Sequence, residues 1–410
     1  MSGPVRRLPA AASVSAGFPR PLSPARFPFT SSSSMRAICF FSPARRALLA
    51  RTRSRLVRQA PSRPFSSSSA SSAFFSARKH APPAREKPPI PFATVSSCPA
   101  PTCTCEPMPK LSWNLPIDYK SPLNGLIGAY NEQVLVCTGT SDWPSRIEDG
   151  NSGDNLAADL KELFGRGGTY SDPYHNVSVL NASFPSSVPR NAALQSSSVY
   201  LLPSFTYVPF LPRLSFDAVE ALAQGFLLPE RLHSAHDGHL SPIHRDRLTR
   251  RPAVRSLLYG VCESIPDILV LICGHGERDA RCGIWGPVLQ AAFERELARV
   301  GFRVEQGPKE VDGEDGERSE SAPTKTPARV GLISHIGGHK FAGNVILYLP
   351  PSLRTPDGLS AHPLAGYGVW YGRVETQHVE GLVQETVLQG RVVEEHFRGA
   401  INDRRQIIRL

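Results

Sequence analysis

The sequence predicts a mixed α/β (α+β) protein, and three observations support this class. Short apolar runs of strand length recur along the body of the chain, the clearest at residues 268–273 and 345–349. Segments with helical spacing of apolar residues lie between them, at 156–164 and 287–300, each followed by a glycine that can end a helix. The longest apolar runs fall well short of the roughly 18 residues that span a bilayer, so we expect no membrane span.

The charge is distributed unevenly along the chain. Residues 1–85 contain 14 Arg, one Lys and no acidic residue, whereas the remaining 31 basic and 36 acidic residues leave the body at −5. The overall charge of +10 is therefore no sign of nucleic-acid binding. An Arg- and Ser-rich segment without acids is typical of a mitochondrial transit peptide, recognised by the import machinery. We expect residues 1–85 to be such a presequence, disordered in the free protein.

The body divides by pattern into two α/β domains. The first, residues 98–250, is smaller and mixed, with strands expected at 131–138, 176–182 and 198–202 and helices at 156–164 and 216–227. The second, residues 265–400, opens with a strand at 267–272 that is apolar enough for the centre of a sheet. An acidic polar segment, 307–328, interrupts it and is expected to be a disordered insertion.

The second domain contains a strand, a cysteine loop and a helix in succession. Strands at 330–334 and 344–349 come next, and we expect them to pair as a hairpin around a short histidine loop. A strand at 369–374 and a helix at 379–388 complete the layer. This order of elements suggests a thioredoxin-like core.

The candidate site consists of two cysteines and two histidines in glycine-bearing loops. Cys273 and Cys282 bracket the first loop, and His335 and His339 lie four residues apart in the second. Thiolate and imidazole are soft ligands for iron or zinc, so this set predicts a Cys2His2 metal or cluster site. His275 lies between the cysteines, and we assign it a supporting or solvent-exposed position instead of a ligand role.

A second cysteine cluster lies near the start of the body. Cys98, Cys103 and Cys105 could be redox thiols, auxiliary ligands or bystanders, and the spacing does not distinguish these. Cys137 lies in an expected strand and is interpreted as a core thiol.

These residues resemble a known family. The Cys273-x8-Cys282 and His335-x3-His339 pairs, with Tyr371-Gly-Arg-Val374 and a helix downstream, are similar to the fungal sucrase/ferredoxin-like family of thioredoxin-like ferredoxins. The resemblance covers roughly residues 98–400. It implies a [2Fe-2S] cluster on Cys273, Cys282, His335 and His339 and a role in mitochondrial redox homeostasis. It implies no sugar-cleaving chemistry, and no paired-carboxylate motif is present.

Three functions stay open from the residues alone. The first is an electron-transfer or redox-sensing protein with an unidentified protein partner, in the mitochondrial matrix or the intermembrane space. The second is a zinc site that only staples the fold. The third is a thiol–disulfide oxidoreductase that acts through the N-terminal cysteines, such as Cys103 and Cys105, or through Cys273 and Cys282, although no C-x-x-C occurs. No nucleotide or flavin motif stands out, so a redox carrier is expected over a stand-alone enzyme.

Overall fold

The computed structural model describes residues 89–102, 104–150, 154–189, 195–310 and 325–410. All of these residues belong to one unit, Pro83–Leu410. The predicted presequence, Cys103 and most of the predicted acidic insertion lie outside the described residues. No helix in the described ranges is both long and apolar enough to cross a membrane.

One large sheet organises the described chain. Its strands are arranged in the order β13-β12-β10-β9-β6-β8-β3-β2-β4-β5, and β7 pairs with β8 beside this path. The mixed α/β class is therefore confirmed. The thioredoxin-like assignment of the second domain stays a prediction. The division into two domains, residues 98–250 and 265–400, also stays a prediction, and the strands of this one sheet come from both regions.

The part of the sheet that carries the predicted ligands is built from residues 268–388, here called the second half. Its central strand β6 runs parallel to β8 and antiparallel to β9, which pairs in turn with β10. The elements of this half are β6 (Ile268–Cys273), α4 (Ala280–Arg299), β7 (Arg303–Val304), β8 (Pro327–Ile333), β9 (Val345–Tyr348), β10 (Gly368–Tyr371), α5 (Thr376–Leu382) and its π-helical continuation η6 (Val383–Leu388).

Residues 132–227, here called the first half, repeat this arrangement. Strand β2 runs parallel to β3 and antiparallel to β4, which pairs in turn with β5. The helix that follows β5 ends in a π-helical turn, as α5 does in the second half. The elements are β2 (Glu132–Cys137), η1 (Ile147–Asp149), α1 (Leu156–Phe164), β3 (Val177–Ala182), β4 (Ser196–Leu202), β5 (Thr206–Pro212), α2 (Asp217–Leu222) and η2 (Ala223–Leu227).

The two halves meet where β3 lies antiparallel to β8, at the pair Ala182 and Ile333. The hydrogen bonds there are reciprocal. The Ser183 N–H donates to the Leu332 carbonyl at 2.8 Å, and the Ser334 N–H donates to the Asn181 carbonyl at 2.9 Å. Each serine Oγ also accepts the backbone N–H of the opposite strand, Ser183 from Leu332 and Ser334 from Asn181. A local two-fold axis between β3 and β8 therefore relates these hydrogen bonds.

The strand register makes the correspondence residue by residue. Cys137 at the end of β2 is opposite Ala182, and Cys273 at the end of β6 is opposite Ile333. Cys137 and Cys273 therefore occupy equivalent positions, and Asn181 is equivalent to Leu332. The four residues Val134–Cys137 (VLVC) and Val270–Cys273 (VLIC) differ at one position.

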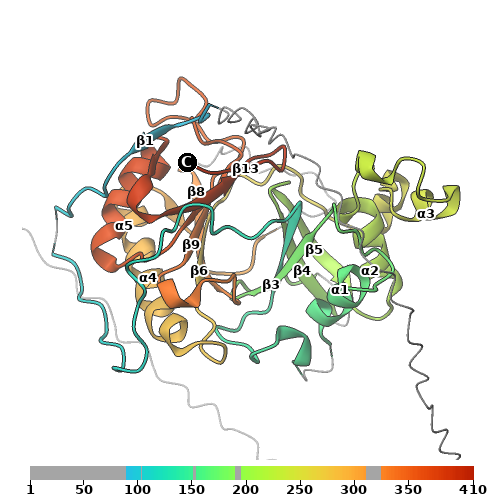
Figure 1. Ribbon diagram of the computed structural model, residues 1–410, viewed down its shortest axis with the longest axis horizontal. Coiled ribbons are helices and arrows are strands. Elements are labelled where there is room, and N and C mark those ends of the chain that lie inside the picture. The colour runs from blue at the N-terminus through green and yellow to red at the C-terminus, as the bar shows by residue number, and fades with distance from the viewer. Residues whose placement is uncertain (1–88, 103, 151–153, 190–194, 311–324) are drawn as a thin grey trace, which may run out of the picture. The chain divides into compact units, whose positions relative to one another are not determined.

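Apolar side chains cover both faces of the sheet. Alternate strand residues such as Val136, Val179, Ile272 and Leu332 share one core with the helices, which lie beside the two halves in Figure 1. The other face packs a second core of larger rings, including a Tyr130–Tyr348 hydroxyl pair at 2.6 Å. The strands are therefore packed between two apolar cores, one on each face of the sheet.

The remaining elements lie at the edges of this frame. Strand β1 pairs parallel with β11 in a separate two-stranded sheet, and β12 and β13 extend the main sheet beyond β10. These elements are β1 (Ala93–Val95), η3 (Ser234–His236), α3 (Pro242–Arg247), η4 (Pro252–Leu257), η5 (His339–Phe341), β11 (Arg391–Val393), η7 (Glu394–His396), β12 (Phe397–Ile401) and β13 (Ile407–Ile408).

Two local predictions in the second half were wrong. Helix α4 begins at Ala280 and not at Pro287, because Asp279 caps it by accepting the Arg281 N–H, and the proline is tolerated inside the helix. The strands on either side of the histidine loop do not pair as a hairpin, because β6 lies between β8 and β9.

Candidate metal centre

The carboxyl ends of β6 and β8 bring the four predicted ligands to one region. Cys273 is the last residue of β6, and Cys282 lies in the first turn of α4. His335 comes after β8 and Ser334, and His339 begins the 3-10 helix η5. Because β6 and β8 are parallel neighbours, their carboxyl ends share one sheet edge, and the cysteine and histidine loops leave from it side by side.

Glycines let helix α4 approach the cysteine loop closely. A Cβ on Gly283 would lie 2.6 Å from the Cα of Gly276, and one on Gly286 would lie 2.8 Å from the Cα of Gly274. Any side chain at these positions would push the helix away from the strand end. The glycines therefore permit Cys282, on the first turn of α4, to reach Cys273.

The two thiols are buried and in contact. Cys273 is 1% exposed and Cys282 fully buried. Hydrogen bonding from Cys282, and then interaction with His335, lowers the pKa of Cys273 well below its ordinary value despite burial. The same contact and burial raise the pKa of Cys282. The two thiols therefore differ in acidity, and a bound cation would favour the thiolate form of each.

The two imidazoles form the other pair. The ring centroids of His335 and His339 lie 5.1 Å apart. The Nδ1 atom of each ring is buried and has no hydrogen-bond partner among the described residues. Burial lowers the pKa of His339, with Asp279 opposing this at 4.0 Å from its Nε2. A neutral imidazole with an unpaired nitrogen is suited to bind a metal, because a buried polar atom without a partner is costly.

The four side chains include a thiol pair and an imidazole pair, and His335 also interacts with Cys273. Within the described chain, no three Cys, His, Asp or Glu side chains are arranged to hold a single metal ion. Cys and His are also the ligand types of binuclear iron–sulfur centres, and in Rieske centres two histidines replace two cysteines on one of the two irons.

His275 supports the centre and is not one of the four donors. The ring is 1% exposed, and its Nε2 lies 2.8 Å from the Trp143 carbonyl and 3.0 Å from that of Pro144. Its Nδ1 accepts the backbone N–H of His335 at 3.1 Å. These contacts require the proton on Nε2. His275 thus joins the loop after β2 in the first half to the histidine loop, a supporting position and not a solvent-exposed one.

Arg398 on β12 is a site residue that the sequence analysis missed. It is 3% exposed and donates to the carbonyls of Leu126 and Gly337 and to Oδ1 of Asn344. Burial lowers the pKa of Arg398 to about 10, while the charge of Cys273 and Cys282 opposes this. The guanidinium thus places a fixed positive charge near the thiols. An isolated arginine in an otherwise apolar strand, FRGAI, was the signal that could have revealed it.

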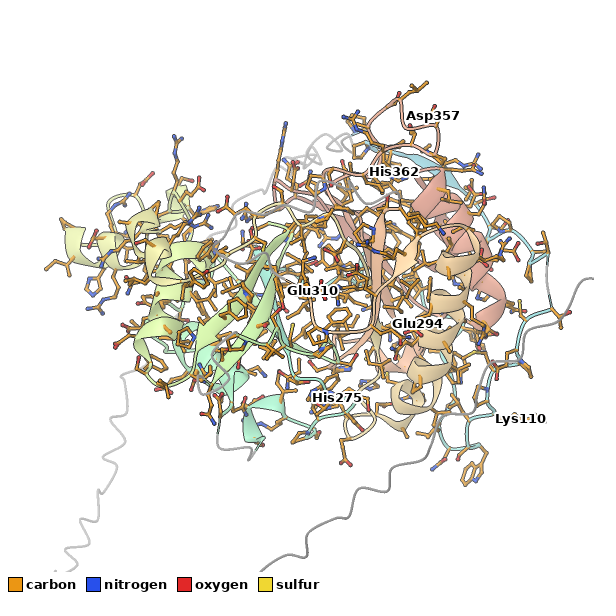
Figure 2. The ribbon with its side chains drawn as sticks, turned by 180° about the vertical axis from the view of Figure 1, so that it is seen from behind. Lys110, His275, Glu294, Glu310, Asp357 and His362 are labelled. Carbon is orange, nitrogen blue, oxygen red and sulfur yellow. The ribbon has the colours of Figure 1, made fainter. Side chains whose placement is uncertain are left out.

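An N-terminal segment, residues 106–121, lies along the outside of this region. The Trp285 indole donates to the Pro109 carbonyl, Arg281 donates to that of Pro116, and Lys340 pairs with Asp118 at 2.8 Å. Figure 2 labels Lys110 in this segment and His275 of the cysteine loop, both in the lower part of the view. The segment therefore contacts both α4 and the loop that carries His339, whose side chain is 44% exposed.

The other predicted thiols lie elsewhere. The Cys98 thiol donates to the His378 carbonyl on α5 at 3.5 Å, and burial, with a smaller effect from Glu395, raises its pKa to about 12. Cys105 is partly buried and contributes to a small hollow with Thr376 of α5, and Cys103 lies outside the described residues. Cys137 is buried in the core of the first half, as predicted.

Comparison with known proteins places the chain in a family. The family model described as Sucrase/ferredoxin-like matches residues 123–399. A protein of Meyerozyma guilliermondii named Altered inheritance of mitochondria protein 32 is 29% identical over 75% of this chain and 95% of its own length.

Two further relatives match over shorter regions. The protein of the same name from Clavispora lusitaniae is 40% identical over 32% of this chain and 34% of its own. Actin patches distal protein 1 of Saccharomyces cerevisiae is 30% identical over 47% of each chain. No solved structure matches. Since the family model covers both halves of the sheet and all four candidate ligands, the chain belongs to the sucrase/ferredoxin-like family.

Proposed function

We propose that the chain is a mitochondrial [2Fe-2S] protein that acts in electron transfer or redox sensing. Cys273, Cys282, His335 and His339 would hold the cluster. The observation that carries the proposal is the donor set: two buried thiols in contact, beside two imidazoles whose Nδ1 atoms lack partners among the described residues. When bound, such a cluster takes up and releases single electrons.

The chain's own residues suit this role in three ways. Two neutral imidazoles in place of two thiolates make the site less negative, which eases reduction. Arg398 adds a buried positive charge that does not depend on protonation near neutral pH. His339 has 44% of its side chain exposed, whereas Cys273 and Cys282 are buried. An unidentified partner protein could therefore approach the site from the histidine side.

The mitochondrial location rests on two supports. Relatives over three quarters of the chain carry the name Altered inheritance of mitochondria protein 32, and residues 1–85 have the composition of an import presequence. We propose residence in the matrix or the intermembrane space. Fractionation of mitochondria with N-terminal sequencing of the recovered chain tests this, and a full-length chain outside the organelle would contradict it.

A thiol–disulfide oxidoreductase using Cys98 has less support. The raised pKa of Cys98, about 12, leaves little thiolate near neutral pH, and thiolate is the attacking species.

The deciding experiment measures iron, zinc and acid-labile sulfide in the chain purified without air, together with its visible spectrum. We expect about two irons and two sulfides per chain, as a binuclear cluster requires. His335→Ala and His339→Ala should lose or change the spectrum, whereas His239→Ala, an exposed histidine outside the site, should not. One zinc and no colour would leave only a structural staple and would refute the electron-transfer proposal.

A further inference from the structure

A pocket outside the candidate metal centre gathers three arginines. Its volume is about 280 Å³. The arginines come from three separate segments: Arg231 follows η2, Arg250 precedes η4, and Arg405 lies between β12 and β13. Glu230 is the only acidic residue of the described lining. Like charges brought together by the fold repel each other, and an anion bound between them would offset that repulsion.

Protein carboxylates balance the arginine charges only in part. Arg250 pairs with Glu230 at 3.2 Å, but the Glu230 side chain is 77% exposed, so water weakens this pair. Arg405 pairs with the buried Glu132 at 2.9 Å. Arg231 is exposed and makes no ion pair with another described residue. Three guanidinium charges against two carboxylates leave an excess positive charge at the pocket, which favours an anion.

The guanidiniums also keep N–H groups that the protein does not use. Arg250 donates through Nε to a backbone carbonyl at 2.6 Å and through Nη1 to Glu230, which leaves Nη2. Arg405 donates through Nη2 to Glu132 and Ser204, which leaves Nε and Nη1. None of these remaining nitrogens is among the buried polar atoms that lack a partner in the described chain, so each is open to solvent. An anion can therefore accept from them without breaking an existing contact.

Arg250 is the residue that most needs a further counter-charge. Its side chain is only 9% exposed. Burial, and then the charge of Arg405, lowers the pKa of Arg250, although Glu132 and Glu230 oppose this. A buried guanidinium beside a second one is unfavourable, and an anion that contacts both would stabilise the charged form of each.

The arrangement of the donors limits the class of anion. A carboxylate has two oxygens, and one guanidinium fork can bind both of them. A phosphate monoester has three terminal oxygens that point apart, so guanidiniums from three segments suit it better. Tyr174 lines the same pocket, is 49% exposed and stacks on His233 with the ring centroids 4.5 Å apart. The exposed ring offers an apolar surface to a short organic group.

We propose that this pocket binds a small phosphate monoester, whose phosphate group is held by Arg231, Arg250 and Arg405. The short organic group of the ligand packs against Tyr174. The pocket shares no residue with the candidate metal centre, so neither the proposal nor its test depends on a cluster.

The test is ³¹P NMR of glycerol 3-phosphate with the full chain, in a buffer without phosphate and at fixed ionic strength. We expect the ³¹P line to broaden as protein is added. Excess inorganic phosphate should restore the line width, whereas lactate, a carboxylate, should not at the same concentration. A line that does not broaden, or equal displacement by lactate, would overturn the proposal.

Single substitutions assign the signal to the pocket, because the basic N-terminal segment, residues 1–85, also attracts phosphate. Arg231→Gln should weaken binding about tenfold, as expected for the loss of a charged hydrogen bond. Arg247→Gln removes the same charge from an exposed position outside the lining and should leave binding unchanged. Equal effects of the two substitutions would refute the assignment to this pocket.

A variant that gains affinity guards against misfolding as an explanation. Glu230→Gln removes the carboxylate that competes for Arg250, so glycerol 3-phosphate should bind several-fold more tightly. Damage to the fold cannot produce such a gain. Unchanged or weaker binding in Glu230→Gln would contradict the proposal.

Discussion

The two halves of the sheet share strand order and register but differ in the segments that connect their strands. After Cys273 the second half has a 20-residue helix that packs on glycines and carries a second cysteine, and its β8–β9 connection carries two histidines. After Cys137 the first half has a helix of nine residues, a cavity, and a β3–β4 connection without histidine. The sheet thus fixes where the strands of each half end, and the connecting segments determine which side chains lie at those strand ends.

The equivalent cysteines give the sharpest test of this comparison. Cys273→Ala should reduce iron and sulfide from about two per chain to near zero, because a cluster of this type needs all four ligands. Cys137→Ala removes the same atoms from the equivalent buried position and should leave iron and sulfide unchanged. Metal analysis and the visible spectrum of both variants decide the matter. Loss of iron in both would mean that the first half also holds metal.

Arg398 belongs to β12, a strand without an equivalent among the described strands of the first half. Arg398→Met should lower the free energy of unfolding by about 2–4 kcal/mol, because buried acceptors at Leu126, Gly337 and Asn344 lose their donor. Chemical denaturation measures this. Arg303→Met, on a surface ion pair 51% exposed at the arginine, should cost no more than about 1 kcal/mol and serves as the control. Equal losses in the two variants would contradict a special role for Arg398.

The sequence predicted the parts of this comparison that depend on local pattern. Apolar runs located β6 and β9, and the helical spacing of residues 156–164 matched α1 to the residue. The composition of the two loops also indicated the candidate ligands, because thiols and imidazoles next to glycines are rare enough to stand out. The sequence alone could not test whether they bind metal.

Non-local features escaped the sequence. The pairing of β6 between β8 and β9 depends on hydrogen bonds between segments far apart in the chain and cannot be recognised from a strand, loop and strand in succession. The repeat left only a four-residue similarity, VLVC and VLIC. Pro287 suggested a helix start, yet the Asp279 cap, well before the proline, begins α4.

His275 connects the two halves and should show a smaller effect than Arg398. His275→Ala removes the donor to the Trp143 and Pro144 carbonyls and the acceptor of the His335 N–H, so we expect a loss of about 1–3 kcal/mol in stability. If the cluster proposal holds, iron content should stay near two while the spectrum shifts, since the His335 loop loses one of its supports. A stable variant with an unchanged spectrum would show that His275 does not position the centre.

The smallest expected effect concerns acid stability in the second half. Burial, and then the neighbouring His378, lowers the pKa of His396 to about 4, below the ordinary 6.5. The unfolded chain therefore binds the proton first, so the contribution of His396 to stability is present above pH 6.5 and is lost as the pH falls toward 4. The loss should be on the order of 1–2 kcal/mol after allowance for water entering near the ring. Denaturation of wild type and His396→Gln at about pH 7 and pH 4.5 measures it, and the variant should lose less stability on acidification. In the first half, burial also lowers the pKa of His175. The Leu227 carbonyl and the charge of Asp172 oppose that shift, whereas the neighbouring His378 adds to the shift at His396, so His175→Gln should change the acid sensitivity less. A larger change from His175→Gln than from His396→Gln would assign the acid-sensitive packing to the first half instead.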